Sequence, residues 1–455
     1  MPYRNIYLPP KWACLSFAIL LFFQFVCVLQ TQAQTRYTVS GTVTDRASGE
    51  HLIGATVRDL KSGKGTVTNT FGFYSLTLPE DSVLIAITYI GYKADGFRYL
   101  LDKNTTQNVT LEQSSILKEV EIVGERYERI EERAQMSRID IPIQQIKNVP
   151  AFMGEKDVLK ALQLLPGVSA GGEGQSGIYV RGGGPDQNLI LLDGVPVYNV
   201  SHLFGFFSVF NPDAVKDVSL IKGGFPARYG GRLSSVIEIN MKEGNENEFH
   251  GEGTIGLIAS KLTLEGPIKK GKSSFIVSGR RTYIDILARP LIKAGFAAEG
   301  SEGVVGYFFD DVNAKVNYRF SEKDRVYLSF YTGQDKFYAD FGERDEDYED
   351  QFKAGLGWGN VTSALRWNHI WSPKLFANTT LTYSRYRFET SNGYESRELE
   401  NRTVVSEDKF DLLYFSGIND VAGKIDFDFL PSPDHYVRFG ANVILHTFKP
   451  GTFRA

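Results

Sequence analysis

Residues Ile178–Met241 decide the fold of this chain; they read IYVRGGGPDQNLILLDGVPVYNVSHLFGFFSVFNPDAVKDVSLIKGGFPARYGGRLSSVIEINM. Short apolar runs at Leu189–Leu192, Val218–Ile221 and Val236–Ile239 alternate with clusters of glycine, proline and aspartate. Apolar runs of this length between turn residues are typical of short β-strands joined by tight turns. The stretch therefore predicts a compact, β-rich domain, and it contains no catalytic constellation.

Four pieces of this stretch, taken in order, resemble the plug domain of TonB-dependent outer-membrane receptors. They are the VRGGG turn at 180–184, the LLDGVPVY hairpin at 191–198, the FNPDAV helix start at 210–215 and the return SLIKGGFPARYGGRLSSVIEI at 219–239. The resemblance implies plug turns at Gly182, Gly183, Asp193 and Gly194. It also implies that the plug arginines pair with acidic residues of a surrounding barrel wall; these are Arg181, Arg228 and Arg232. Solvated turn arginines are the alternative.

Composition agrees with a large β protein. A length of 455 residues suggests about three domains. The 45 Gly, 32 Phe and 23 Tyr favour aromatic-rich strands with frequent turns. A net charge of −4 gives no reason to expect binding to nucleic acid.

The first 33 residues have the layout of a secretory signal. Arg4 and Lys11 precede the apolar run Leu15–Leu29, and small residues follow up to Ala33. We expect cleavage near Ala33, because the apolar run is short for a membrane-spanning helix; an uncleaved anchor is the alternative. Both cysteines of the chain lie inside this segment, so we expect no disulfide in the mature protein.

Residues 35–113 predict a small antiparallel β-sandwich. Short β-rich runs such as TVSGTVTD and VLIAITYIGYK are separated by turn residues at close intervals. The segment resembles the carboxypeptidase regulatory-like domain that precedes the plug in many Bacteroidetes receptors. That domain is not catalytic, and no zinc-binding His-x-x-Glu pair occurs near His51, His202 or His250. We expect no metal and no cofactor.

A polar linker at 114–138 follows, with one alternating half-apolar run. The run contains Glu119, Val120, Glu121, Ile122 and Val123. Its position resembles that of the TonB box, an extended segment that adds as a strand to the periplasmic C-terminal domain of TonB. Main-chain hydrogen bonds would then provide the affinity, and the sequence requirement would be loose. The last strand of the preceding sandwich is the alternative.

The plug is expected at 139–245, with a first helix at Asp157–Leu165. Residues 249–455 then alternate between apolar and polar side chains, as in Val312–Phe320 and Leu375–Tyr383. Such alternation over about ten residues is typical of a transmembrane β-strand with lipid outside and water inside. Trp367, Trp371, Tyr386 and Phe388 are the residues that we expect in aromatic girdles at the strand ends.

Connection lengths support a barrel over a soluble sandwich. Short turns are expected at 267–272, 321–324, 372–374 and 431–434, and long polar loops at 288–306, 334–355 and 389–409. If the first short turn is periplasmic, an even number of strands precedes it, so 249–266 should be a hairpin. About nine strands are then present, fewer than the twenty-two that the resemblance implies. We therefore expect an N-terminal fragment whose barrel is incomplete.

Enzyme signals are weak. Gly251–Gly256 matches the dinucleotide-binding glycine pattern, but its flanks are strand-like and polar. The acidic cluster at 343–350 lacks the spaced glycine of a calcium loop, so a solvated outer loop is the better interpretation. No catalytic residues are predicted.

The predicted fold class is mainly β. A small β-sandwich comes first, then an α+β plug domain, then the first part of an antiparallel transmembrane β-barrel that is incomplete. The predicted function is energised import of a scarce nutrient, such as a ferric siderophore, cobalamin, peptide or glycan, across the outer membrane of a Gram-negative bacterium. The implied partners are TonB, outer-membrane lipids and the nutrient, with a surface lipoprotein as a further candidate and no nucleic acid. A non-transporting adhesin and a periplasmic hydrolase are the alternatives.

Overall fold

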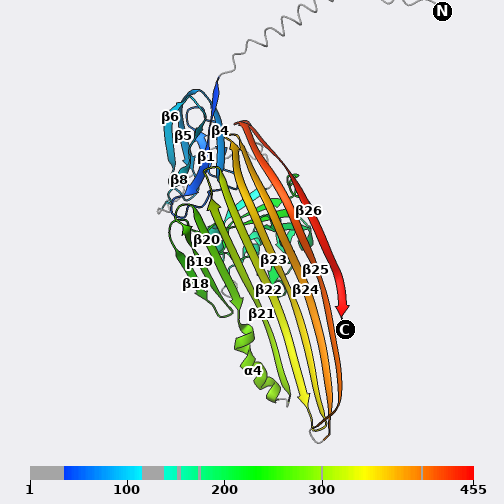
Figure 1. Cartoon of the computed structure of the whole chain (residues 1–455). Helices are drawn as coiled ribbons and strands as arrows, with labels where there is room; N and C mark the ends of the chain where they lie inside the picture. The colour runs from blue at the N-terminus through cyan, green and yellow to red at the C-terminus, as the bar shows by residue number, and fades with distance from the viewer. Residues whose placement is uncertain are drawn as a thin grey trace, which may run out of the picture.

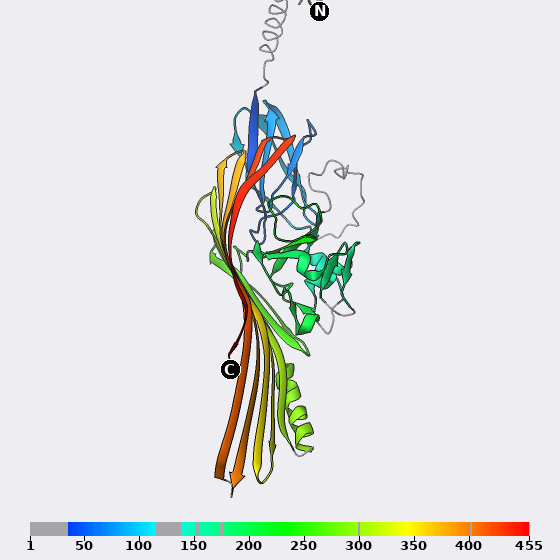
Figure 2. The same cartoon turned by 90° about the vertical axis from the view of Figure 1, so that its right-hand side faces the viewer.

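The computed structural model describes residues 35–114, 138–150, 155–172, 176–298, 301–400 and 403–454. These residues form an N-terminal sandwich, a central domain and a long antiparallel sheet (Figure 1). The central domain lies against one face of the long sheet, which we call the inner face (Figure 2).

The N-terminal sandwich consists of two small sheets with a shared apolar core. Its strands are β1 (Arg36–Asp45), β2 (Thr56–Asp59), β3 (Gly65–Val67), β4 (Phe73–Pro79), β5 (Asp81–Thr88), β6 (Asp95–Leu101), β7 (Thr105–Thr106) and β8 (Val109–Leu111). One sheet has the order β4-β1-β7, with β8 also paired to β1, and the other has the order β3-β2-β5-β6. Alternating residues such as Val83, Ile85 and Ile87 of β5 are buried between the sheets. The predicted small β-sandwich is confirmed, but it is not wholly antiparallel, because β7 and β8 pair with β1 in parallel.

The central domain is built on a five-stranded mixed sheet. Its elements are β9 (Arg138–Pro142), α2 (Ile143–Lys147), α3 (Val158–Gln163), β10 (Val168–Ala170), β11 (Ile178–Val180), η2 (Pro185–Gln187), β12 (Asn188–Leu192), β13 (Val195–Pro196), β14 (Ser201–His202), η3 (Leu203–Gly205), β15 (Phe207–Ser208), β16 (Val215–Lys222) and β17 (Ser235–Met241). The sheet order is β13-β12-β17-β16-β9, with β12 parallel to β17. The three apolar runs quoted first are its buried strands β12, β16 and β17.

Two local predictions in the central domain have different outcomes. The first helix exists as α3, and the Asp157 side chain caps it by accepting from the backbone N–H groups of Leu159 and Lys160. The expected helix start at Phe210–Val215 is wrong, because this segment forms a turn that leads into strand β16. There the Asn211 side chain accepts from the backbone N–H of Asp213, which holds the chain in a turn rather than a helix.

The long sheet contains nine antiparallel strands among the residues described, each paired with its sequence neighbours. They are β18 (His250–Ile255), β19 (Ala259–Lys269), β20 (Ser273–Thr282), β21 (Glu302–Arg319), β22 (Asp324–Arg344), β23 (Tyr348–Ser372), β24 (Leu375–Glu400), β25 (Thr403–Ser432) and β26 (His435–Arg454). Helix α4 (Ile284–Ala298) lies between β20 and β21. The hairpin predicted at 249–266, the count of nine strands and the four short turns are confirmed.

The predicted long polar loops are mostly wrong. Segment 334–355 contains the end of β22 and the start of β23, and segment 389–409 does the same for β24 and β25. Segment 288–306 contains most of helix α4 and the start of β21. Because β25 alone has 30 residues, the expected strand length of about ten was also too short.

The two faces of the long sheet differ as the alternation predicted. Val312 and Val316 are exposed on the outer face, whereas Asn313 and Lys315 are buried under the central domain. The expected girdle is partly wrong. Trp367 and Trp371 are exposed on the outer face, but Tyr386 and Phe388 belong to the opposite set of alternating positions, so they lie on the inner face; Tyr386 lines a pocket with residues 196–201 of the central domain.

The sandwich and helix α4 mark opposite ends of the long sheet. The sandwich lies beside the short turns, which we call the short-turn rim, and α4 lies toward the far ends of the strands (Figure 1). Within the described residues, no helix has the length and apolar character needed to cross a membrane.

Candidate functional site at the inner face of the long sheet

The aspartate–glycine turn of the central domain touches the inner face. Asp193 and Gly194 connect β12 to β13 and have φ values of 48° and 82°. A two-residue hairpin turn with both residues left-handed favours this Asp-Gly pair, because aspartate tolerates the conformation and glycine adopts it freely. The Asp193 side chain is buried and accepts from the backbone N–H of Met241 at 3.0 Å, which ties the turn to β17.

Two cations of the long sheet meet this turn. Lys315 of β21 lies 3.0 Å from the Asp193 carboxylate, and its side chain is 5% exposed. Arg366 of β23 donates to the Asp193 backbone carbonyl at 2.7 Å. The turn is therefore held from two strands of the sheet at once.

A second group of ion pairs lies around Glu155 and Asp213 of the central domain. Lys261 of β19 lies 3.5 Å from the Glu155 carboxylate and 3.6 Å from that of Asp213. Arg280 of β20 lies 3.6 Å from Glu155, and Lys147 of α2 lies 2.9 Å from Asp213. Carboxylates of the central domain again face cations of the sheet.

A third contact reverses these charges. The ring of His202 is 1% exposed, and its Nε2 lies 2.8 Å from a carboxylate oxygen of Asp311 on β21. Its Nδ1 contacts Asp335 on β22, and the ring stacks on Phe309 with centroids 4.2 Å apart. Burial by itself would lower the pKa of His202, but the two carboxylates raise it to about 9. The ring therefore carries a positive charge at neutral pH.

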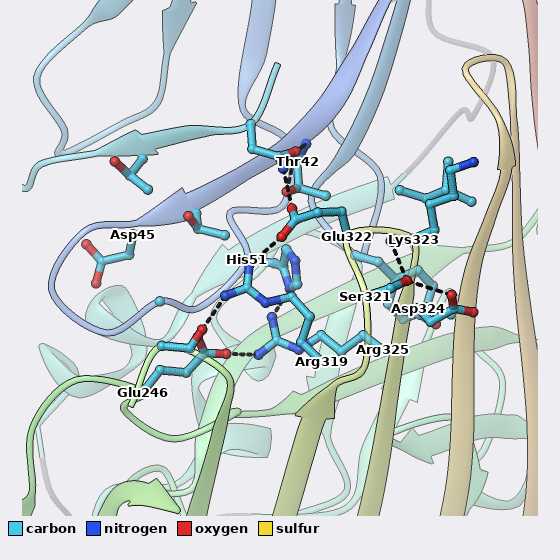
Figure 3. A pocket seen from close by; sticks show the side chains of 18 of the residues that line it. Thr42, Asp45, His51, Glu246, Arg319, Ser321, Glu322, Lys323, Asp324 and Arg325 are labelled. Carbon is cyan, nitrogen blue, oxygen red and sulfur yellow. Dashed lines mark hydrogen bonds and ion pairs between the residues drawn. The ribbon is translucent and has the colours of Figure 1, made fainter. Parts of the chain in front are cut away.

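At the short-turn rim, the sandwich joins the same network. Arg325 of β22 pairs with Glu246, which follows the central domain, and its Nη1 lies 3.3 Å from Nδ1 of His51 in the sandwich (Figure 3). The side chains of Arg325, Glu246 and His51 are all at least nine-tenths buried. Three parts of the chain therefore share one buried ionic cluster.

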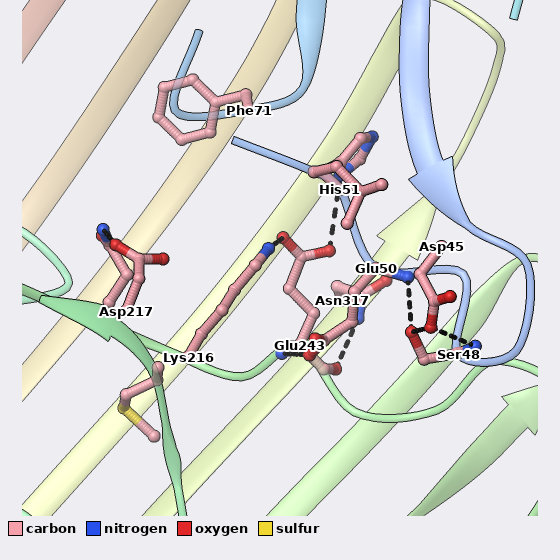
Figure 4. Close-up of polar contacts among 12 residues, drawn as sticks. Asp45, Ser48, Glu50, His51, Phe71, Lys216, Asp217, Glu243 and Asn317 are labelled. Atoms are coloured by element: carbon pink, nitrogen blue, oxygen red, sulfur yellow. Dashed lines mark hydrogen bonds and ion pairs between the residues drawn. The ribbon is translucent and has the colours of Figure 1, made fainter. Parts of the chain in front are cut away.

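Glu243 is the centre of this cluster, which we call the rim junction (Figure 4). Its carboxylate lies 3.4 Å from Lys216 of β16 and 3.4 Å from His51, while its backbone N–H donates to the carboxylate of Glu50 in the sandwich. Burial alone would raise the pKa of Glu243. The neighbouring cations, with Lys216 the foremost, hold it well below its usual range.

Such contacts are specific but expensive to form. Each buried ion loses several kcal/mol of hydration, and its partners only compensate when the geometry is good. Removing one partner would leave a buried unpaired charge, at a cost of roughly 3–5 kcal/mol. The central domain is therefore fixed in one position against the sheet, by contacts that water could replace if the surfaces separated.

Comparison with known families assigns two parts of this arrangement. Residues 133–236 match the TonB-dependent receptor plug domain, and residues 39–123 match the CarboxypepD_reg-like domain. The chain therefore carries the plug and CarboxypepD_reg-like domains of a TonB-dependent receptor. The central domain is the plug, the long sheet is part of an outer-membrane β-barrel, and the inner face is its lumenal wall.

Individual relatives share sequence at low identity. The ferrienterobactin receptor of Escherichia coli K12 is 26% identical over 58% of this chain and 42% of its own length. The TonB-dependent receptor P39 of Formosa agariphila is 24% identical over 81% of this chain and 34% of its own length. The crystal structure of the siderophore receptor PirA from Acinetobacter baumannii gives a TM-score of 0.34 at 15% identity, covering 68% of this chain and 61% of that one. The chain thus spans less than half the length of these two curated relatives.

These domains indicate the setting of the protein. TonB-dependent receptors are outer-membrane proteins of Gram-negative bacteria, and they are not enzymes. The glycine pattern at Gly251–Gly256 agrees with this, because its residues lie in and directly after strand β18 instead of between a strand and a helix. Among the described residues, no group of three acidic, histidine or cysteine side chains is arranged to hold a metal ion.

The predicted plug turns lie where the chain reverses or approaches itself closely. Arg181 and Gly182 have φ values of 49° and 86°, directly after β11. A Cβ atom added to Gly183 would lie 2.4 Å from the side chain of Ser234, so only glycine fits there. These positions shape the plug, and their roles in the receptor stay predictions.

The predicted pairing of plug arginines with the wall also stays a prediction. Arg228 lies 4.0 Å from Glu238 of the plug strand β17, and its guanidinium lies over the ring of Tyr229. Arg232 donates to the backbone carbonyl of Gly231 and lies 6.0 Å from the ring centroid of Tyr198. The predicted TonB box, Glu119–Val123, lies outside the described residues.

Sequence reasoning missed the residues that do connect plug and wall. It assigned basic residues to the plug and acidic residues to the wall, whereas most of the observed pairs have the opposite polarity. The wall cations are Lys261, Arg280, Lys315, Arg325 and Arg366. The available signal was a long basic side chain at an inward position of an alternating strand, as at Lys315 between Ala314 and Val316.

Proposed function

We propose that the receptor imports a scarce nutrient by TonB-driven displacement of the plug. The observation that supports this most directly is the ionic character of the plug–wall interface, with Asp193, Glu155 and His202 each paired to residues of the wall. A plug that has to move needs an interface that separates without exposing a large apolar surface. Charged groups meet this need, because water solvates them on both sides once they part.

The nutrient class is open among those that the family transports. One relative is named for ferrienterobactin, which makes ferric siderophores the first class to examine. Cobalamin, peptides and glycans complete the panel. In each case the ligand would bind on the far side of the plug from the sandwich, and TonB would act from the sandwich side.

Plug displacement is tested by fixing the plug to the wall. Asn211 of the plug donates to the hydroxyl of Ser278 on β20 at 2.8 Å, so Asn211→Cys with Ser278→Cys places two thiols at a natural contact. We expect oxidation of this pair, in the complete receptor in its native host, to abolish uptake while surface binding of the nutrient persists. A thiol reductant should restore uptake, and each single-cysteine variant should transport under both conditions. Uptake that continues through the cross-linked receptor would contradict displacement of this part of the plug.

Coupling to TonB is tested at the predicted box. Val120→Pro removes a backbone donor, which strand addition to TonB requires, whereas Val120→Thr keeps the donor and the β-branched shape. We therefore expect Val120→Pro to abolish uptake and Val120→Thr to retain it, with equal amounts of both variants in the outer membrane. Unchanged uptake in Val120→Pro would show that TonB binds outside the predicted box. Ligand binding without uptake in the wild type would instead favour an adhesin.

A further inference from the structure

We infer that the N-terminal sandwich is docked as a cap over the periplasmic exit of the lumen, so that it has to undock before a substrate can leave. This inference rests on the proposed function, because it adds a second barrier to the same path.

The sandwich contacts widely separated points of the short-turn rim. Asn108 donates to Glu322 in the β21–β22 turn at 2.8 Å, and Lys64 pairs with Asp434 in the β25–β26 turn at 3.0 Å. Strands β22 and β25 are three positions apart in the sheet, which corresponds to about 14 Å across the strands. The sandwich therefore contacts an arc of the rim that spans several strands, and not a single strand.

Between these points, aromatic contacts tie the sandwich to the wall. Phe71 and Phe73 both stack on Phe376 of β24, each with ring centroids 5.4 Å apart. The guanidinium of Arg366 lies 5.2 Å from the ring centroid of Phe71. Because Arg366 also holds the Asp193 turn of the plug, one wall residue contacts both the cap and the plug.

The loop 46–51 of the sandwich fits the segment that connects plug and barrel. The backbone carbonyl of Ser48 accepts from the N–H of Glu246 at 2.7 Å, and that of Ala47 accepts from the Asn247 side chain at 3.0 Å. Gly49 has a φ of 79°, and a Cβ added there would lie 3.1 Å from the Glu246 carboxylate. The loop therefore lies directly against the segment that connects plug and barrel, and a larger residue at Gly49 would be strained.

The chemistry of this interface suits a cap that opens. Its centre is the rim junction, where charges from sandwich, plug and wall compensate one another while closed and would each be hydrated when apart. Beside it lies a cavity of about 280 Å³ between the sandwich and the rim, lined by polar groups that include Thr42, Glu322 and Arg319 (Figure 3). A polar, incompletely filled interface admits water during separation, unlike a packed apolar core.

The test cross-links the sandwich to the rim with a reducible bismaleimide linker in the complete receptor. Lys64→Cys with Asp434→Cys replaces an exposed ion pair between sandwich and rim, so folding should be unaffected. The matched control, Lys93→Cys with Glu112→Cys, replaces an exposed ion pair 2.9 Å long inside the sandwich. We expect the linker to abolish uptake in the first pair with surface binding intact, a reductant to restore it, and the control pair to transport throughout.

The plug pair Asn211→Cys with Ser278→Cys, oxidised in parallel, separates the two proposals. A block by the plug cross-link together with unimpaired uptake in the linked Lys64–Asp434 pair would overturn the cap and leave plug displacement standing. Unimpaired uptake in both cross-linked pairs would overturn both the cap and plug displacement. A block in the control pair as well would show that stiffening the sandwich is enough, and would also overturn undocking as the cause.

Discussion

His202 is the residue whose charge state most directly reports on the plug–wall contact. Its pKa is raised to about 9 by Asp311 and Asp335, against the opposing effect of burial, whereas an unfolded histidine titrates near 6.5. A raised pKa stabilises the folded state fully below pH 6.5, and this stabilisation is lost as the pH rises toward 9. The full effect is at most about 3 kcal/mol. We expect the unfolding temperature of the detergent-solubilised receptor to fall between pH 6.5 and pH 9.

Two substitutions test this assignment. His202→Asn removes the titrating ring, so its unfolding temperature should be lower at pH 6.5 and should depend much less on pH. His435→Asn changes an exposed histidine at the start of β26 and should keep the wild-type dependence. An unchanged pH dependence in His202→Asn would assign the effect to another group.

At the scale of the elements, the hairpin of β24 and β25 differs most from what the sequence suggested. The two strands pair from Leu375 opposite Phe429 to Glu400 opposite Thr403, with one register shift between Glu398 and Leu399. Segment 389–409 is polar on both faces, so it lacks the alternation that identified the other strands. Backbone hydrogen bonds of an antiparallel pair do not require apolar side chains, and a strand in water on both sides therefore leaves no periodic signal.

Hydrogen exchange distinguishes such a hairpin from a loop. We expect the amides of residues 390–400 to exchange slowly, because this segment of β24 pairs with β23 on one side and with β25 on the other. The turn 345–347 between β22 and β23 should exchange fast. The end of β24 near the short-turn rim, which begins at Leu375, is the slow reference within the same molecule. Equally fast exchange in residues 390–400 and in the turn 345–347 would show that 389–409 is the loop predicted from the sequence.

The candidate site shows the same division between local and distant information. The strands of the plug, its Asp193-Gly194 turn and the inward position of Lys315 all follow from residues near one another in the sequence. The contact between Asp193 and Lys315 does not, because it depends on how the plug is seated against strands more than a hundred residues away. Long-range docking of this kind has no periodicity, and one sequence therefore predicts the parts of the site but not their pairing.

At the scale of the whole molecule, the rim and the far hairpins should face opposite compartments. The sandwich lies at the short-turn rim, and we expect the chain to enter the plug from the periplasm. Glu322 of the β21–β22 turn should then face the periplasm, and Glu346 of the β22–β23 turn should face the cell exterior. We expect a membrane-impermeant maleimide to label Glu346→Cys on intact cells and Glu322→Cys only after the outer membrane is permeabilised. Both side chains are exposed and both turns are short, so a difference in labelling reports the compartment and not burial. Labelling of Glu322→Cys on intact cells would put the sandwich on the cell surface, and neither TonB coupling nor a periplasmic cap would then be possible.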